Sequence, residues 1–443
     1  MHSKLNMDRE YVIGQIIREF LEREEEIIRR DLKVPLTTSL RKAISIIGPR
    51  RAGKTFFLLY IYQQVRETNP AGFLPLDDDR LYPPSLAALD LAVQVLRGMY
   101  SGREIRYLFL DEVQEVNGWE RFVKRIVDRR DCLVFVTGSS SRLLSKEIAS
   151  MLRGRTLVYE IFPFNFNEVL RAKGVLAGRY ISGRTEALIR RELDMYLKYG
   201  GYPEVVLKSE KDRILREYAD VMLYRDMVER HNLKNLKLAK LFFKTVFTSF
   251  AREFSIKRVV NYLKSMGLRV SRNTLYNYLE YMNDAYIAFP LKRYSNSLRI
   301  VEQSIPKLYV VDNGLTRVYS IHTTELYGRL LENLVFMELR KKGVKENQDI
   351  FYYRENGREV DFIVLEEDRV KQLIQVTYHL EYDNREQWRR EVETLFKASK
   401  TLACKNLQII TWSQEDKIRK NNKTIEIIPV WKWILNLYRR QRE

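Results

Sequence analysis

The chain has few of the residues that bind soft metals or form disulfides. Its 443 residues include two cysteines, Cys132 and Cys404, and four histidines that are scattered along the sequence. No zinc-ligand spacing occurs, and two cysteines so far apart do not indicate a disulfide framework. These absences predict that any bound metal is held by oxygen atoms.

Long apolar runs are also missing. No stretch of eighteen apolar residues is present, and residues 1–10 are polar rather than a basic region that leads into an apolar one. The sequence therefore predicts neither a transmembrane segment nor a secretion signal, and we expect a cytoplasmic protein.

Acidic residues are outnumbered by basic ones. The 77 lysines and arginines exceed the 58 aspartates and glutamates and give a formal net charge of +19. Such an excess favours a polyanionic partner, either nucleic acid or an anionic membrane surface, and charge alone does not choose between them. The length exceeds that of one ordinary core and predicts several domains.

Residues 48–55 read Gly-Pro-Arg-Arg-Ala-Gly-Lys-Thr and lie between an apolar run at 43–47 and a helix-like run at 56–62. A phosphate-binding loop needs this strand-to-helix position, because its glycines let backbone N–H groups approach the phosphates. The lysine adds a point charge, the threonine hydroxyl suits Mg²⁺, and the helix adds its positive N-terminal end. The loop arginines either touch phosphate or stay solvated. We expect nucleotide binding by Gly48, Pro49, Arg50, Arg51, Ala52, Gly53, Lys54 and Thr55.

A second motif supplies two acids. Residues 107–110 are apolar and are followed by Asp111 and Glu112, at a normal ATPase separation from the loop lysine. We expect Asp111 to hold Mg²⁺ and Glu112 to polarise the attacking water as a general base. The two motifs together predict hydrolysis rather than binding alone.

Two further positions have open roles. Residues 133–137 form a strand candidate that runs into three serines, and Ser139 is a candidate sensor of the γ-phosphate unless these serines only begin the next helix. Arg155 either reaches the γ-phosphate of a neighbouring subunit as an arginine finger or forms an ordinary surface ion pair. A finger that works in this way requires a homo-oligomer.

The pattern of apolar segments predicts the fold. Strands alternate with helices between residues 43 and 161, which is typical of a parallel α/β sheet with its site at the carboxyl ends of the strands. Residues 8–30 look like one charged amphipathic helix that packs on this core. Residues 186–236 have helical spacing, interrupted by Tyr-Gly-Gly-Tyr-Pro at 199–203, and suit a lid over the nucleotide.

Three helix candidates follow, at residues 237–252, 256–266 and 272–284, and mixed α/β patterns return after residue 307. The last two helices resemble a helix-turn-helix. They would leave Arg272, Asn273 and Asn277 near the exposed start of the final helix, where a recognition helix meets the DNA major groove. The same fold often serves only to pack domains together, so DNA contact rests more on net charge than on this motif.

The motifs resemble a known family: AAA-type (AAA+) ATPases, common in archaea and bacteria, whose C-terminal part is a domain of unknown function related to the PD-(D/E)XK nucleases. The resemblance spans nearly the whole chain, and its first two motifs together are specific. It is carried by residues 48–55, Asp-Glu-Val-Gln at 111–114 with Trp119-Glu120, Thr-Gly-Ser-Ser-Ser at 137–141, Gly154-Arg155, Tyr-Gly-Gly-Tyr-Pro at 199–203 and Glu-Val-Asp-Phe at 359–362.

The resemblance implies an α/β fold class, with a P-loop NTPase parallel-sheet core, a helical lid, a winged-helix-like segment and a C-terminal nuclease-like α/β domain. The implied cofactors are ATP and Mg²⁺. The expected domains are an N-terminal helix at 1–40, the ATPase core at 41–185, the lid at 186–236, the winged-helix-like domain at 237–300 and the nuclease-like domain at 301–443.

The resemblance also implies a degenerate nuclease site. Active members place a glutamate on a helix, an aspartate on a strand, and an acid and a lysine on the next strand, because carboxylates hold Mg²⁺ and the lysine helps to activate water. Here neither Gln375 nor Thr377 can replace the missing charges, and Lys371 on the same strand face is a poor substitute. We expect the fold without cleavage. The corresponding residues are Glu332, Asp361, Gln375 and Thr377.

The same domain interleaves arginines and lysines with Tyr352, Tyr353, Tyr378 and Trp388. This mixture suits nucleic-acid binding or is only solvated charge over a core edge. The leading hypothesis is an AAA-type ATPase whose nucleotide state moves DNA-associated C-terminal modules. The alternatives are a slow ATPase switch in protein signalling or assembly, whose protein partner the sequence does not identify, and an ATP-dependent nuclease.

Overall fold

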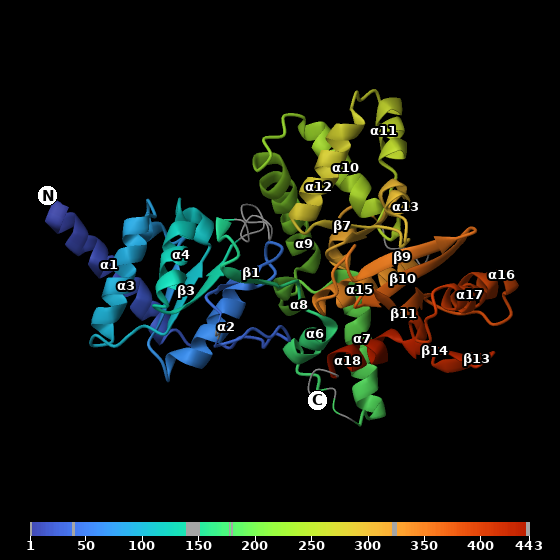
Figure 1. The fold of residues 1–443 in the computed structure, drawn as a ribbon, viewed down its shortest axis with the longest axis horizontal. Coiled ribbons are helices and arrows are strands. Elements are labelled where there is room, and N and C mark those ends of the chain that lie inside the picture. The colour runs from blue at the N-terminus through green and yellow to red at the C-terminus, as the bar shows by residue number, and fades with distance from the viewer. Residues whose placement is uncertain are drawn as a thin grey trace. The chain divides into compact units, whose positions relative to one another are not determined.

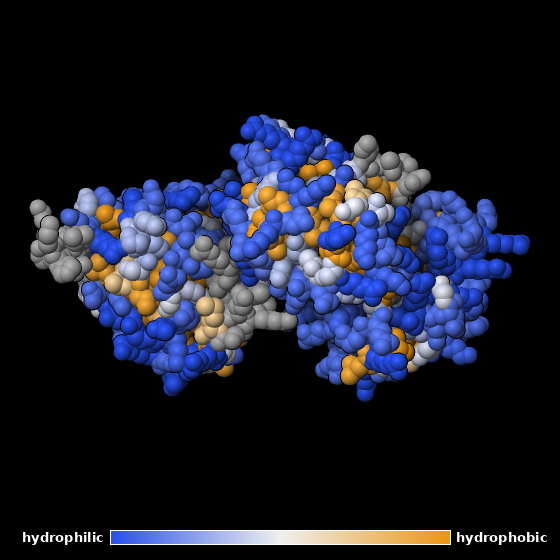
Figure 2. Space-filling model, turned by 90° about the horizontal axis from the view of Figure 1, so that it is seen from above, coloured by the Kyte–Doolittle hydropathy of each residue, from blue (hydrophilic) through white to orange (hydrophobic). Residues whose placement is uncertain are grey.

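The computed structural model describes residues 2–37, 40–138, 151–176, 178, 180–320 and 326–439, with side chains from residue 8 onward (Figure 1). The chain divides into two compact units, Met1–Phe162 and Pro163–Glu443, and each is described by itself. No helix in these ranges is long and apolar enough to cross a membrane. Figure 2 shows a mostly hydrophilic face with scattered hydrophobic areas.

The first unit is built on a five-stranded parallel sheet with the order β2-β3-β4-β1-β5. Every residue of β1, β2 and β3 is buried, as expected for parallel strands that are covered on both faces. The parallel core is therefore as predicted, although β5 was not anticipated. The strands are β1 (Ala43–Ile47), β2 (Ala71–Pro75), β3 (Tyr107–Asp111), β4 (Leu133–Thr137) and β5 (Thr156–Glu160).

Helix α2 packs on this sheet and shares a core with its aromatic residues, among which Phe109 and Phe135 stack with ring centroids 4.7 Å apart. The helices of this unit are α1 (His2–Glu22), α2 (Lys54–Arg66), α3 (Leu86–Met99) and α4 (Trp119–Arg129), with 3₁₀ turns η1 (Asp79–Leu81) and η2 (Val113–Glu115).

The prediction of one helix over residues 8–30 is wrong in its second half, because α1 ends at Glu22. The guanidinium of Arg66 donates to the carbonyls of Phe20, Leu21 and Arg23, at 3.0, 2.7 and 3.1 Å. These bonds satisfy carbonyls at the helix end and stop the helix there. The chain then continues as an extended arm whose apolar residues join the core of the sheet.

The second unit contains a six-stranded mixed sheet, β13-β14-β12-β11-β10-β9, and a three-stranded antiparallel sheet, β6-β8-β7. The mixed α/β pattern expected after residue 307 is confirmed by the six-stranded sheet. The strands are β6 (Arg252–Glu253), β7 (Ala288–Leu291), β8 (Lys307–Val310), β9 (Ile350–Glu355), β10 (Arg358–Glu366), β11 (Arg369–Val376), β12 (Leu407–Thr411), β13 (Asp416–Lys420) and β14 (Lys423–Pro429).

The helices of the second unit surround both sheets. They include the three predicted in the 237–284 region, and the hydroxyl of Ser271 accepts from the Thr274 N–H and caps α12. The helices are α6 (Phe166–Ala172), α7 (Gly183–Tyr199), α8 (Pro203–Leu207), α9 (Lys211–Val221), α10 (Leu236–Thr248), α11 (Ile256–Ser265), α12 (Arg272–Asp284), α13 (Leu298–Gln303), α14 (Asn313–Thr316), α15 (Tyr327–Lys341), α16 (Arg385–Trp388), α17 (Thr394–Thr401) and α18 (Val430–Arg439), with π-helices η3 (Met222–Glu229) and η5 (Arg389–Glu393).

The Tyr-Gly-Gly-Tyr-Pro segment ends α7 and begins α8 inside the second unit. Asp312 receives the Gly201 N–H at its Oδ2, at 2.7 Å, and the Gly314 N–H at its Oδ1, at 2.8 Å. The carbonyl of Gly201 in turn accepts from the Phe164 N–H at 2.7 Å. The segment is thus a packing joint of this unit, and its role as a lid stays a prediction.

Asp312 is expected to make the stability of this unit depend on pH. Burial raises its pKa to about 6 from 3.8, so the fold favours the protonated form. Protonated Asp312 therefore adds to the free energy of unfolding. This stabilisation is complete below pH 3.8 and is lost as the pH rises through 6, and the difference between the two pKa values corresponds to about 3 kcal/mol. Denaturant titrations should therefore show wild type losing about that much against Asp312→Asn between pH 4 and 7. Parallel pH profiles for the two proteins would contradict the assignment.

The predicted nucleic-acid patch on the C-terminal sheet is wrong in its aromatic part. Tyr352 and Tyr353 are buried in the core, and Tyr378 stacks between Tyr327 and Trp412. Aromatic rings were expected to alternate with basic residues on an exposed surface, but Tyr352 and Tyr353 point to opposite faces of β9 and both faces are covered at this point.

Candidate functional site

The loop at residues 48–55 connects β1 to α2. Gly48 has a φ of 146°, and a Cβ there would lie 2.0 Å from the carbonyl oxygen of Ile161. Gly53 caps α2 in the left-handed region, with a φ of 91°. Both conformations favour glycine, so the local sequence itself specifies a loop whose backbone is open to a ligand.

Lys54 is the first residue of α2 and is almost fully buried. Its Nζ donates to the carbonyls of Gly48 and Pro49, at 3.2 and 3.1 Å, so the ammonium lies against the inner curve of the loop. Ala52 is buried, whereas Arg50 is half-buried and Arg51 is exposed. The two interpretations of the loop arginines stay open.

Asp111 ends β3 and is buried beside the last residue of β4. The Thr137 hydroxyl donates to Oδ1 of Asp111 and accepts the Glu112 N–H at 3.1 Å. Burial raises the pKa of Asp111 to about 6, while hydrogen bonds from the Thr137 and Thr55 hydroxyls act in the opposite direction. The predicted metal-binding threonine and aspartate therefore lie at the same edge of the sheet.

Glu112 leaves the strand in a left-handed conformation, with φ and ψ both 51°. This region is costly for a residue with a side chain, and such strain commonly persists at functional sites. The side-chain amide of Gln114 donates to Oε2 of Glu112 and orients its carboxylate. The sequence reasoning gave no role to Thr137 or Gln114, although both stand within or beside the quoted motifs.

The donor set fits Mg²⁺. Thr55 and Asp111 offer one hydroxyl and one carboxylate, and Mg²⁺ in nucleotide sites takes few protein oxygens and completes its shell with phosphates and water. Within the described residues no group of three histidines, cysteines or acids forms a complete metal cage.

Ser139, the candidate sensor, lies outside the described residues. Arg155 is described, and its Nε lies 2.6 Å from Oδ1 of Asp128 on α4. In this single chain Arg155 thus forms the surface ion pair that was one of its two predicted roles. Its role as an arginine finger stays a prediction.

Arg30 is a part of the site that the sequence reasoning missed. It comes from the extended arm after α1 and is buried, and it donates to the Ala52 carbonyl at 2.9 Å and to the Phe162 carbonyl at 2.5 Å. Arg30 therefore ties the phosphate loop to the segment that follows β5. Only the folded chain reveals this role, because the two acceptors are backbone atoms distant in sequence.

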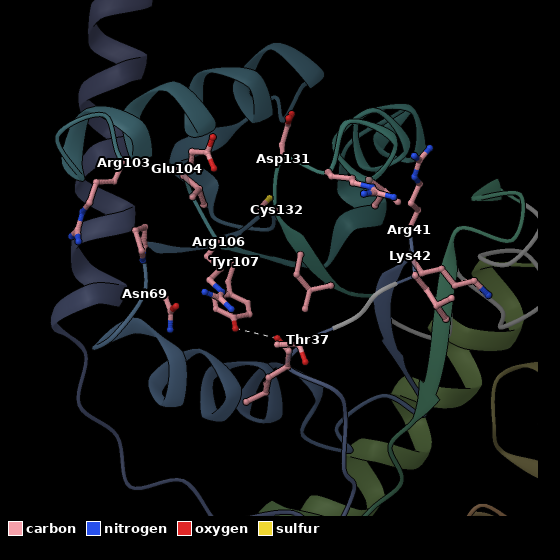
Figure 3. Close-up of a pocket in the computed structure, with 17 residues that line it drawn as sticks. Thr37, Arg41, Lys42, Asn69, Arg103, Glu104, Arg106, Tyr107, Asp131 and Cys132 are labelled. Atoms are coloured by element: carbon pink, nitrogen blue, oxygen red, sulfur yellow. Dashed lines mark hydrogen bonds between the residues drawn. The ribbon is translucent and has the colours of Figure 1, made fainter.

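A pocket of about 680 Å³ lies elsewhere in the first unit, next to the residues that precede strands β1 to β4. It is rich in cations, but Figure 3 shows Arg41, Lys42 and Arg103 pointing away from one another. Since a phosphate needs converging donors, this pocket is a weaker nucleotide site than the loop at the carboxyl ends of the strands.

Three of the four residues of the expected nuclease-like site come together in the second unit. Glu332 lies on α15, Asp361 on β10 and Gln375 on β11, and the Oε1 of Gln375 accepts the Asp361 N–H at 3.3 Å. Thr377 follows β11, and its hydroxyl donates to the carbonyl of His379.

The sequence reasoning missed Lys307 on β8, whose Nζ contacts three carboxylates of this cluster. Burial alone would lower the pKa of Lys307, but the neighbouring charges raise it well above its ordinary value. Lys371, the cation considered from the sequence, instead pairs with Glu366 on the surface.

Three families match successive parts of the chain. A model described as an AAA domain matches residues 40–170, and two domains of unknown function match residues 190–324 and 327–433. An uncharacterised protein of Methanocaldococcus jannaschii is 39% identical over 97% of this chain and 96% of its own length. An uncharacterised Haemophilus influenzae protein is 28% identical over 77% of this chain and 84% of its own length.

Two solved structures are more distant. Aeropyrum pernix ORC1 in complex with DNA is 14% identical, over 70% of this chain and 89% of its own, with a TM-score of 0.27. AMPPCP-bound DnaA from Aquifex aeolicus is 13% identical, over 61% and 86%, with a TM-score of 0.25. The identity and coverage of the M. jannaschii relative decide the assignment: the chain belongs to the same family as that protein, and its residues 40–170 are an AAA domain.

Proposed function

We propose that the protein hydrolyses ATP with Mg²⁺ at the loop formed by residues 48–55. The observation that carries this proposal is the placement of Asp111 and Glu112, which are linked through Thr137 at the carboxyl edge of the sheet that also presents the loop. An ATP-binding protein without hydrolysis would not need a strained second acid at this position.

Each residue of the proposed ATP site has a separate role. The loop N–H groups and the Lys54 ammonium would bind the phosphates, and bound Mg²⁺ would neutralise charge on the phosphate oxygens. Thr55 and Asp111 would hold that ion. Glu112 would accept a proton from water at its carboxylate, while Gln114 and Thr137 keep the carboxylate and the backbone in place.

Lys54→Ala is the first test of the proposed site. The variant removes the only charge buried within the loop, so we expect ATP affinity to fall at least about tenfold and turnover to be lost. Lys42→Ala, which removes a lysine at the opposite edge of the sheet, is the matched control. Equal phosphate release by both variants and wild type would place hydrolysis elsewhere.

We further propose that the α11–α12 face binds DNA. Residues 254–279 include no acidic residue, and their five basic side chains are exposed and form no ion pair within the described ranges. Arg272, Asn273 and Asn277 are exposed at the start of α12. The element order α10-β6-α11-α12-β7-α13-β8, with β6, β7 and β8 in one antiparallel sheet, supports a winged-helix-like segment. The five basic residues are Lys257, Arg258, Lys264, Arg269 and Arg272.

The paired substitution Arg269→Ala/Arg272→Ala tests this face. Removal of each side chain that binds a phosphate should reduce the slope of log affinity against log salt by about 1, so duplex DNA binding should weaken most at low salt. Lys400→Ala/Lys405→Ala removes the same charge from exposed positions near the C-terminal sheet. Equal weakening by both pairs would mean that only net charge matters.

DNA-stimulated turnover separates the leading proposal from a slow ATPase switch that acts on proteins. If no duplex, single-stranded or branched DNA changes the rate of ATP hydrolysis, the switch is favoured.

A cytoplasmic location and a homo-oligomer completed by Arg155 remain parts of the proposal. Sedimentation of the ATP-bound protein with and without Arg155→Ala would test the latter.

A further inference from the structure

The acid cluster of the second unit has a lysine at its centre. Nζ of Lys307 lies 2.6 Å from Glu332 Oε1, 2.9 Å from Glu359 Oε1 and 3.1 Å from Asp361 Oδ1. The lysine side chain is 4% exposed, so these contacts form away from bulk water. One ammonium thus meets carboxylates from both α15 and β10.

Two further donors contact the carboxylates of the cluster. Oδ2 of Asp361 accepts the Val376 N–H at 2.9 Å, and Glu332 Oε1 also accepts the Tyr309 hydroxyl at 2.7 Å. At the position where active nucleases have a third acid, Gln375 supplies only a neutral amide. The donor set therefore does not fit a divalent cation, because that ion would have to share these oxygens with an ammonium of the same charge sign.

We propose that Lys307 is a built-in cation that takes the place of the metal ion in this nuclease-like cluster. Its ammonium neutralises the carboxylates permanently and fastens β8 of the three-stranded sheet to α15 and to β10 of the six-stranded sheet. The site joins two parts of the second unit and does not cut nucleic acid.

Other contacts reinforce the same junction. The side-chain amide of Asn333 on α15 pairs with both backbone groups of Val310 on β8, at 2.8 and 3.0 Å. The Tyr294 N–H donates to the Tyr352 carbonyl at 2.7 Å, and Arg354 pairs with Glu253. The α11–α12 face and the C-terminal sheet are consequently parts of one body rather than two independently moving modules.

Lys307→Met tests the proposal because it keeps the length of the side chain and removes its charge. Removing one partner from a buried ionic cluster is strongly destabilising, so we expect Tm to fall by about 5–10 °C. Mn²⁺ should then bind to the uncovered carboxylates and restore part of the Tm, and this effect should vanish in Lys307→Met/Asp361→Asn. Lys371→Met, which breaks only the surface pair with Glu366, should change neither property.

Titration of Mn²⁺ into nucleotide-free protein, followed by electron paramagnetic resonance, gives the decisive comparison. Asp361→Asn should leave the Mn²⁺ binding of the wild-type protein unchanged, because the carboxylates around Lys307 bind no Mn²⁺. Mn²⁺ binding that is present in wild type and lost in Asp361→Asn would overturn the proposal. If Lys307→Met does not fold, Lys307→Met/Glu332→Gln should recover stability by removing one negative charge as well. Failure of this second variant to recover would reduce Lys307 to a packing role.

Discussion

Glu112→Gln is expected to lower ATP turnover at least about 100-fold while ATP still binds. A glutamine keeps the shape of the side chain but cannot accept a proton from the attacking water, and general-base catalysis of this kind typically contributes two to four orders of magnitude. The loop and Asp111 are unchanged in this variant. Single-turnover phosphate release and equilibrium binding of a fluorescent ATP analogue would separate the two effects.

Glu115→Gln is the matched control for this prediction. Glu115 lies in the same short turn, is exposed, and loses the same charge when it is replaced. We expect its turnover to remain within about twofold of wild type, because Glu115 is exposed and lies three residues beyond Glu112, at the far end of the turn. Full activity in Glu112→Gln, or an equal loss in Glu115→Gln, would remove Glu112 from its proposed role.

Gly200→Ala is expected to destabilise the second unit by roughly 3–5 kcal/mol. Gly200 has a φ of 75° and a ψ of −164°, a region essentially restricted to glycine. A Cβ there would also lie 1.6 Å from Oδ1 of Asp312, so the buried carboxylate would have to leave its backbone donors. Chemical denaturation monitored by tryptophan fluorescence would measure the loss.

Gly183→Ala provides the comparison in the same helix. Gly183 is the first residue of α7, and a Cβ at this position meets no atom within 4 Å. Its replacement should change the stability by at most about 0.5 kcal/mol. Similar losses of stability in Gly200→Ala and Gly183→Ala would show that Asp312 does not restrict the residue at position 200.

The parts of the molecule that follow from short sequence segments were predictable. The strand before the phosphate loop, the loop glycines and the acids that end β3 are each specified within a few residues, and their positions follow from parallel-sheet geometry. Helix α12 was predictable to the residue, because Ser271 is a local cap and the apolar spacing is regular.

The parts that depend on distant partners were not predictable. Helix α1 ends where Arg66 captures its carbonyls, and Lys307 is recognisable as a buried cation only once β8 packs against α15 and β10. Tyr352 and Tyr353 looked like a stacking surface because a single strand does not reveal which of its faces another element will cover.

The bond from Arg30 to the Phe162 carbonyl gives the first unit a mechanical property. Phe162 is the last residue before Pro163 begins the second unit, and the same guanidinium holds Ala52 in the phosphate loop. Gly48 also lies directly against the Ile161 backbone. One side chain thus braces two backbone segments of the first unit, so neither the phosphate loop nor the segment after β5 can shift without straining the hydrogen bond that Arg30 makes to the other.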